Sequence, residues 1–173
     1  MVHAFLALAL AQAATPAAPA STPPPPTPAC EDERHGQFDF WLGEWEVYPR
    51  GREQQVASSL IEKVSAGCAI RESWMPLQGR EGSSLSTYDP ATGRWHQLWI
   101  GGSPGRVLFD GGVIEGAMVL TGYWGRDAQG NPTLVRMTYT LEDDGSVRQY
   151  GQASSDHGRT WADSFDFIYR RKD

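Results

Sequence analysis

The sequence predicts an all-β domain in which about 8–10 strands close into an antiparallel up-and-down barrel. From residue 38 onward, β-favouring segments alternate with turn residues about every eight to twelve positions, a spacing typical of sandwiches and barrels. Every connector is too short for a crossover helix, so neighbouring strands should be antiparallel. A sheet with this many strands tends to curl, and closure removes its exposed edges. A β-sandwich is the alternative.

The expected strands are separated by clusters of Gly, Pro, Asn and Asp, residues that favour turns. We expect strands at 44–49, 55–65, 68–75, 82–89, 94–101, 105–110, 112–123, 133–142, 146–154 and 161–170. Segment 112–123 should divide into two short strands at Glu115-Gly116. A short helical turn at 36–43 should lead into the first strand.

Several expected strands carry faces that mix aromatic and polar side chains. Such faces are formed by Trp95, Gln97 and Trp99 in 94–100 and by Cys68, Ile70, Glu72 and Trp74 in 68–75. The filled core of a sandwich shows a cleaner alternation of apolar and polar residues. The mixed faces therefore favour a barrel that encloses a partly polar cavity.

The first 29 residues differ in composition from the rest of the chain. Residues 4–14, AFLALALAQAA, have the length of a signal-peptide core and are too short to span a bilayer. The first three residues carry no Lys or Arg, so a disordered tail is the alternative. Residues 15–29 consist almost entirely of Pro, Ala, Ser and Thr, which predicts a disordered, extended linker.

This organisation predicts a signal peptide at 1–14, a linker at 15–29 and a single barrel domain at 30–173. The protein should be exported, either periplasmic or secreted. Its net charge of −6 is spread without blocks of one sign, which argues against a nucleic-acid partner. No later segment is apolar enough to cross a membrane as a helix, so we expect no integral span in the mature chain.

Cys30 and Cys68 form an even count in a compartment expected to be oxidising, which predicts a disulfide between them. Two separate buried thiols are the alternative. A lipid-modified Cys30 is disfavoured because the apolar run ends well before it.

Gly43-x-Trp45 follows the predicted helical turn and opens the first strand. It resembles the Gly-x-Trp start of the lipocalin and fatty-acid-binding (calycin) barrels. The resemblance implies that Trp45 plugs one end of the barrel. It also implies that an Arg at the end of the last strand, Arg170 or Arg171, packs across the indole ring.

A longer set of motifs resembles a family of exported bacterial proteins known as a domain of unknown function with a lipocalin-like fold. These motifs are FDFWLGEWEV at 38–47, Gly67-Cys68, the segment from Tyr88-Asp89-Pro90 to Trp95, and the closing Ser-x-Asp-x-Gly-x-Thr-Trp. The resemblance covers about residues 30 to 171. It implies a fold and a compartment, and it supplies no catalytic residues.

The closing motif runs from Ser154 to Trp161 and matches the Asp-box of sialidase-like propellers. There the box is a structural hairpin, in which Asp and Ser bond the turn backbone and Trp packs beneath it. The box occurs once in this chain, so Asp156 and Trp161 should stabilise a hairpin between the last two strands.

The candidate ligand-binding residues are Glu72, Trp74, Trp99, Arg136 and Arg148. Glu72 should face inward, where burial would raise the pKa of its carboxyl. Arg136 and Arg148, together with Arg71, could hold the carboxylate of an acid lipid while aromatic side chains surround its tail. The scattered histidines and the lack of nucleophile or dinucleotide motifs predict no metal site, cofactor or catalytic residue.

These features favour a binding module for a small apolar or amphiphilic molecule. An envelope interaction protein with a filled barrel and an enzyme that uses the barrel cavity are the alternatives. The sequence does not specify the oligomeric state.

Overall fold

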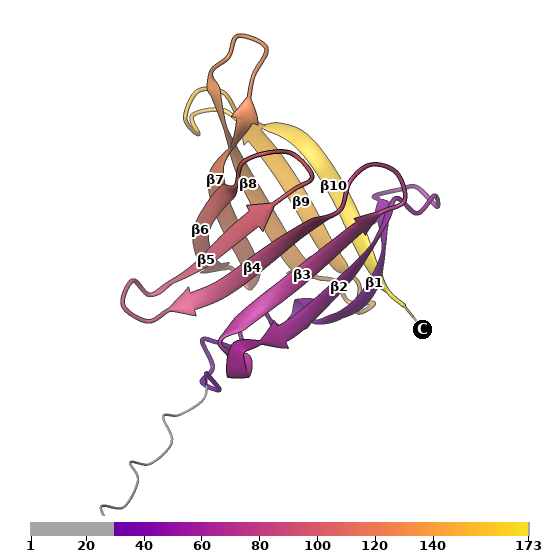
Figure 1. The fold of residues 1–173 in the computed structure, drawn as a ribbon, viewed down its shortest axis with the longest axis vertical. Coiled ribbons are helices and arrows are strands. Elements are labelled where there is room, and N and C mark those ends of the chain that lie inside the picture. Colours follow the sequence, from indigo (N-terminus) through magenta and orange to yellow (C-terminus); the bar gives the residue numbers. More distant parts are fainter. Residues whose placement is uncertain (1–29, 173) are drawn as a thin grey trace, which may run out of the picture.

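The computed structural model describes residues 30–172, which form one closed antiparallel barrel of ten strands (Figure 1). Each strand pairs with the next along the chain, and β1 pairs with β10 to close the sheet. The strands are β1 (Gly43–Pro49), β2 (Ala57–Val64), β3 (Ala69–Pro76), β4 (Gly82–Asp89), β5 (Arg94–Ile100), β6 (Val107–Ile114), β7 (Ala117–Arg126), β8 (Pro132–Leu141), β9 (Val147–Ser154) and β10 (Ala162–Arg171). The predicted up-and-down barrel is confirmed. The predicted signal peptide and linker lie outside the described residues.

One predicted strand boundary was wrong. A break between 105–110 and 112–123 was expected, but β6 runs without interruption through Gly111 and Gly112. A side chain at Gly111 would overlap the backbone carbonyl of Val119 on β7, so this glycine permits close strand approach. The turn expected at Glu115-Gly116 is present, and both residues have positive φ angles, of 50° and 82°.

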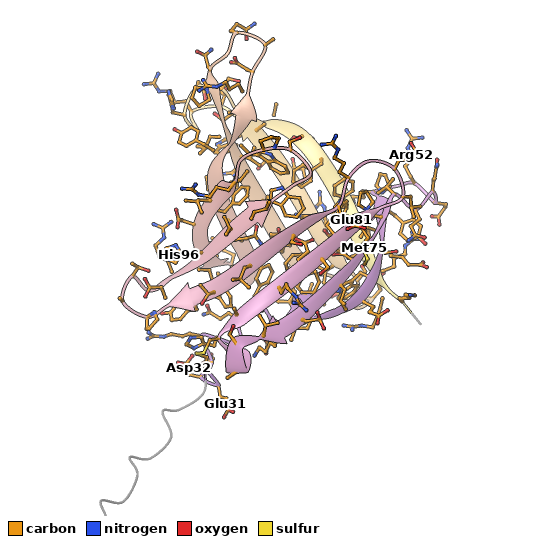
Figure 2. The ribbon with its side chains drawn as sticks, in the orientation of Figure 1. Glu31, Asp32, Arg52, Met75, Glu81 and His96 are labelled. Atoms are coloured by element: carbon orange, nitrogen blue, oxygen red, sulfur yellow. A yellow bond between two sulfur atoms is a disulfide. The ribbon has the colours of Figure 1, made fainter. Side chains whose placement is uncertain are left out.

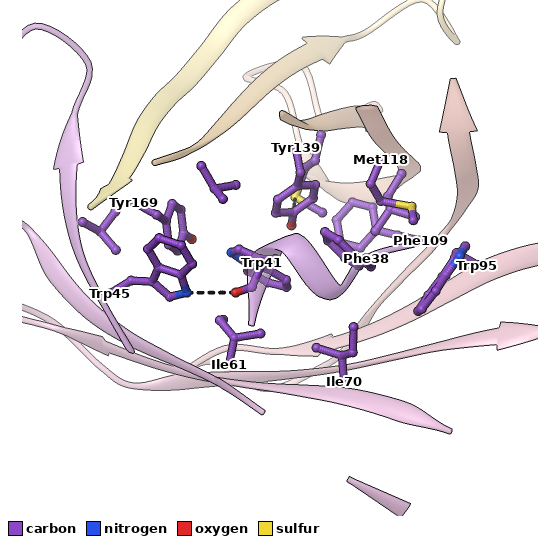
Figure 3. Close-up of a cluster of buried hydrophobic side chains, with 14 of the residues drawn as sticks. Phe38, Trp41, Trp45, Ile61, Ile70, Trp95, Phe109, Met118, Tyr139 and Tyr169 are labelled. Atoms are coloured by element: carbon purple, nitrogen blue, oxygen red, sulfur yellow. Dashed lines mark hydrogen bonds between the residues drawn. The ribbon is translucent and has the colours of Figure 1, made fainter. Parts of the chain in front are cut away.

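The N-terminal segment plugs one end of the barrel. Its short 3-10 helix η1 (Asp39–Trp41) matches the predicted helical turn and leads into β1. Phe38, Trp41 and Trp45 are fully buried, and the Trp45 Nε1 donates a hydrogen bond to the Trp41 carbonyl oxygen at 2.8 Å (Figure 3). We call these three residues the aromatic plug. Tyr139 from β8 continues the cluster, with its ring centroid 4.9 Å from that of Trp41.

The predicted contact between the last strand and Trp45 is confirmed for Arg171. Its guanidinium carbon lies 4.5 Å from the centroid of the Trp45 ring. Gly43 leaves room for this side chain, because a Cβ at Gly43 would lie 2.5 Å from Arg171 Nη1. Arg170 points elsewhere, over the ring of Tyr48 and onto Glu53 at 3.0 Å.

The predicted disulfide between Cys30 and Cys68 is present, with 4.8 Å between the two Cα atoms. Cys68 lies between a 3-10 turn, η2 (Ser65–Gly67), and β3. The bond therefore ties the start of the described chain to the plugged end of the barrel. None of the helices in residues 30–172 is long and apolar enough to cross a membrane.

The Asp-box forms the predicted hairpin between β9 and β10. One carboxylate oxygen of Asp156 accepts hydrogen bonds from the backbone N–H groups of Arg159, at 3.0 Å, and Thr160, at 2.9 Å. The Trp161 Nε1 donates to the Gly158 carbonyl oxygen at 3.1 Å. The hydrogen bonds to Asp156, those from Thr160 above all, hold the pKa of its carboxyl well below its usual range. The turn therefore keeps its charge-assisted bonds across the physiological pH range.

Replacing both cysteines, Cys30→Ala with Cys68→Ala, should lower the free energy of unfolding by about 3–4 kcal/mol, because the bridge restricts a long loop of the unfolded chain. Urea denaturation followed by tryptophan fluorescence measures this change. The wild-type protein in reductant should lose the same stability. A loss below about 1 kcal/mol in both samples would contradict the expected role of the bridge.

Arg171→Ala should lower the free energy of unfolding by about 0.5–2 kcal/mol, because it removes the guanidinium from the Trp45 ring. Arg94→Ala is the matched control, since Arg94 is exposed and makes no ion pair or ring contact within residues 30–172. Thermal and urea unfolding of both variants provide the comparison. Equal effects from the two substitutions would show that the Trp45 contact adds nothing.

Candidate functional site

A cavity of about 250 Å³ lies inside the barrel, on the side of the aromatic plug that faces the open end. Its walls are largely aromatic. The lining residues are Glu72, Trp74, Gln97, Trp99, Phe109, Trp124, Met137, Tyr139, Gln149, Phe165, Phe167 and Tyr169. Arg52 and Glu81, in loops at the open end, lie far from Glu31 and Asp32 at the plugged end (Figure 2). The barrel is therefore filled at one end and hollow toward the other.

Strands β3 and β5 show how the sequence sets the depth of each lining residue. Every second side chain of a strand faces inward. On β3 this gives Ile70 in the hydrophobic core, Glu72 at middle depth and Trp74 toward the open end. On β5, Trp95 packs against Phe38, while Gln97 and Trp99 follow at the two levels above it. The middle level of both strands is thus polar.

We call the polar side chains at this depth the polar layer, which comprises Glu72, Gln97, Tyr139, Gln149 and Tyr169. The Tyr169 hydroxyl donates to Gln149 Oε1 at 2.8 Å, and Gln149 Nε2 donates to the Tyr139 hydroxyl oxygen at 2.9 Å. Burial raises the pKa of both tyrosines, so their hydroxyls stay protonated. The layer therefore presents fixed donors and acceptors beneath an aromatic wall.

Glu72 faces inward as predicted and is 4% exposed. Its two carboxyl oxygens accept hydrogen bonds from Ser59 Oγ at 3.3 Å and from Ser84 Oγ at 2.9 Å. Neither partner carries a charge, so burial outweighs the hydrogen bonds and raises the pKa of Glu72 from about 4.5 to about 7. Within the described part of the chain, no Arg, Lys or His lines the cavity to compensate a negative charge.

The open end of the barrel carries a second hollow of about 460 Å³, which adjoins the cavity. Trp74, Trp99 and Trp124 line both spaces, so these three rings form the passage between them. The outer hollow is bordered by the 101–106 loop and by two basic residues, Arg80 and Arg106. Arg80 Nη1 donates to the Gly102 carbonyl oxygen at 2.7 Å, which ties the β3–β4 loop to this segment.

The predicted role of Arg136 and Arg148 was wrong, because both side chains lie on the outer face of the barrel. Arg136 contacts Gln152 at 2.7 Å and stacks on the ring of Trp161 at 4.2 Å. Arg148 forms a two-point ion pair with Asp166, with both contacts at 2.8 Å. Arg71 is also outside and pairs with Glu62 at 2.6 Å. These pairings satisfy the guanidinium groups in partly wet positions, where their desolvation costs less than it would inside the barrel.

The other three candidate residues, Glu72, Trp74 and Trp99, lie together in the cavity wall. Sequence reasoning did not assign Tyr139 or Gln149 to the site. Alternation carries the signal for both residues, because Tyr139 shares its strand face with Val135 and Met137, and Gln149 shares its face with buried Val147. No group of three or more His, Cys, Asp or Glu is placed to hold a metal ion in residues 30–172.

No family model matches the chain, and no curated protein matches it. The resemblance of FDFWLGEWEV and the accompanying motifs to an exported bacterial family therefore stays a prediction.

Glu72 should make the free energy of unfolding depend on pH. Its contribution should fall by about 3 kcal/mol as the pH rises from about 4.5 to about 7. Because the pKa of Glu72 is raised in the folded state, this state holds the proton more tightly than the unfolded chain does in this range. The resulting stabilisation of the folded state is complete below the pKa that Glu72 has in the unfolded chain. It is lost above the pKa that Glu72 has in the folded state.

Glu72→Gln should remove this part of the pH dependence and should be more stable than the wild type at about pH 8. Urea denaturation at about pH 5 and about pH 8 measures the free energy of unfolding of the variant and of the wild type. The control is Glu62→Gln, a change to a half-exposed carboxylate on the outer face of the neighbouring strand β2. A Glu72→Gln variant with the wild-type pH dependence would show that Glu72 ionises normally.

Proposed function

We propose that the protein is an exported, lipocalin-like binding protein that holds a small hydrophobic or amphiphilic molecule inside its barrel. The observation that carries the proposal is the aromatic-walled cavity, which has a polar layer at its base and leads to an outer hollow. Binding sites for small molecules are typically concave and apolar, with a few fixed polar groups that orient the ligand. The cavity has these properties.

The size of the cavity limits the part of the ligand that is enclosed. A water molecule occupies about 30 Å³ in the liquid, so 250 Å³ corresponds to about eight or nine non-hydrogen atoms. A longer molecule would extend between Trp74, Trp99 and Trp124 into the outer hollow. The hollow also counts against the alternative of an interaction protein with a filled barrel.

The lining residues favour binding over catalysis. Glu72 is the only carboxyl among the described residues that line the cavity, and the two tyrosines there have raised pKa values. General acid–base catalysis requires a group that ionises near the working pH and a partner to complete the proton transfer. The cavity offers one such group and no evident partner within the described part of the chain.

The disulfide supports the exported part of the proposal, because such bonds persist mainly in oxidising compartments. The apolar run at 4–14 and the resemblance of the 38–47 motif to an exported bacterial family point the same way. Periplasmic extraction of the full chain, followed by N-terminal sequencing, tests export and the position of cleavage.

Binding is tested with N-phenyl-1-naphthylamine, an uncharged probe whose fluorescence rises in apolar sites. We expect saturable binding at one site and quenching of tryptophan emission, because three Trp side chains line the passage. Trp124→Ala should weaken binding about three- to tenfold through loss of an aromatic contact. Leu108→Ala, at an exposed position on β6, is the control and should bind like the wild type. Absence of saturable binding to the wild-type protein would overturn the proposed function.

A further inference from the structure

The charge distribution of the cavity bears on the chemical class of the ligand. Glu72 is buried, and both of its hydrogen-bond donors are neutral hydroxyls on β2 and β4. The groups that face it from β8 and β10 are the phenols of Tyr139 and Tyr169. A carboxylate at this position accepts two of its possible hydrogen bonds from Ser59 and Ser84, so it keeps further acceptor capacity.

The aromatic wall has a complementary preference. Trp74 packs against Phe167 and Tyr169, with ring centroids 6.0 Å and 6.4 Å apart, and Trp124 packs against Trp99 and Phe109, each 6.2 Å away. The faces of aromatic rings carry negative electrostatic potential and attract cations. The wall and the carboxyl therefore favour positive charge and disfavour negative charge.

We propose that the ligand is an organic amine, bound with its protonated nitrogen at Glu72 and its apolar body between the tryptophans. This inference rests on the proposed binding function and specifies the ligand of the same cavity. The ammonium would donate to the free acceptor positions of the carboxylate, which is already removed from water by the fold. Such charge-assisted hydrogen bonds are stronger than neutral ones.

The opposite orientation would place an acid head at Arg80 and Arg106 in the outer hollow, with the tail in the cavity. Arg80 already donates a hydrogen bond to the Gly102 carbonyl oxygen. A ligand with its acid head at Arg80 would place its apolar tail against the buried Glu72. Such a ligand would gain nothing from Glu72, the only carboxyl among the described residues that line the cavity. The amine orientation uses this group directly.

The test uses octylamine, octan-1-ol and octanoate, which share a tail and differ in the head group. Each ligand competes with N-phenyl-1-naphthylamine for the wild-type protein at about pH 8, and isothermal titration calorimetry confirms the affinities. We expect octylamine to bind at least about tenfold more tightly than octan-1-ol, and octanoate to bind most weakly. The probe and octan-1-ol test the cavity itself, while the difference between head groups tests the amine.

The pH dependence gives a second measurement. Because the pKa of Glu72 is about 7 without ligand, amine binding requires loss of its proton at lower pH. The affinity for octylamine, which stays protonated throughout, should rise by up to about 30-fold between about pH 5.5 and about pH 8. The affinity for octan-1-ol should change far less. In Glu72→Gln the preference for octylamine over octan-1-ol should fall to near one, while Glu62→Gln should retain the full preference.

The outcomes separate the two proposals. If neither the probe nor any of the three ligands binds, the proposed binding function is wrong. If the probe and octan-1-ol bind but octylamine has no advantage, the cavity binds ligands and the amine inference is wrong. Tightest binding by octanoate would also overturn the inference, in favour of an acid head at the basic residues of the outer hollow.

Discussion

The aromatic plug determines which part of this barrel is filled and which part is hollow. Phe38 and Trp41 precede the first strand, and Trp45 lies within it, so eight residues of chain contribute three large side chains to one end. The Trp45 hydrogen bond to the Trp41 carbonyl and the Arg171 contact across the Trp45 ring fix this arrangement. Dense packing around the aromatic plug leaves the remaining interior volume between the plug and the open end of the barrel.

The boundary between these two regions is where polar side chains occur. Glu72 and Gln97 each lie one inward step from a core residue and one step from a tryptophan at the passage. Hydrogen bonds between polar groups stabilise this layer, but Glu72 receives only neutral donors. A buried carboxyl without a cation is costly in its charged form. The fold therefore holds a carboxyl whose charged form a bound cation would stabilise.

Most of the fold could be predicted from the sequence, because turn spacing and period-two alternation are local signals. Two features were predicted wrongly, and only the first of them needed three-dimensional information. Gly111-Gly112 has the composition of a turn, yet the close approach of β7 requires a glycine within the strand. Arg136 and Arg148 were assigned to the ligand because arginine suits carboxylates. Their neighbours Val135, Met137 and Val147 face inward, so strict alternation places both arginines outside.

The outward position of the arginines and the inward position of Glu72 follow from one physical rule. An arginine cannot lose its charge in the protein, so inside the barrel it would need a permanent counter-ion. Asp166 and Glu62 provide such partners on the surface for Arg148 and Arg71. A glutamate is able to bind a proton and become neutral, so it can occupy the interior alone. The cavity consequently contains a carboxyl that is tolerated when protonated, and a bound cation would stabilise its charged form beyond what the Ser59 and Ser84 hydroxyls provide.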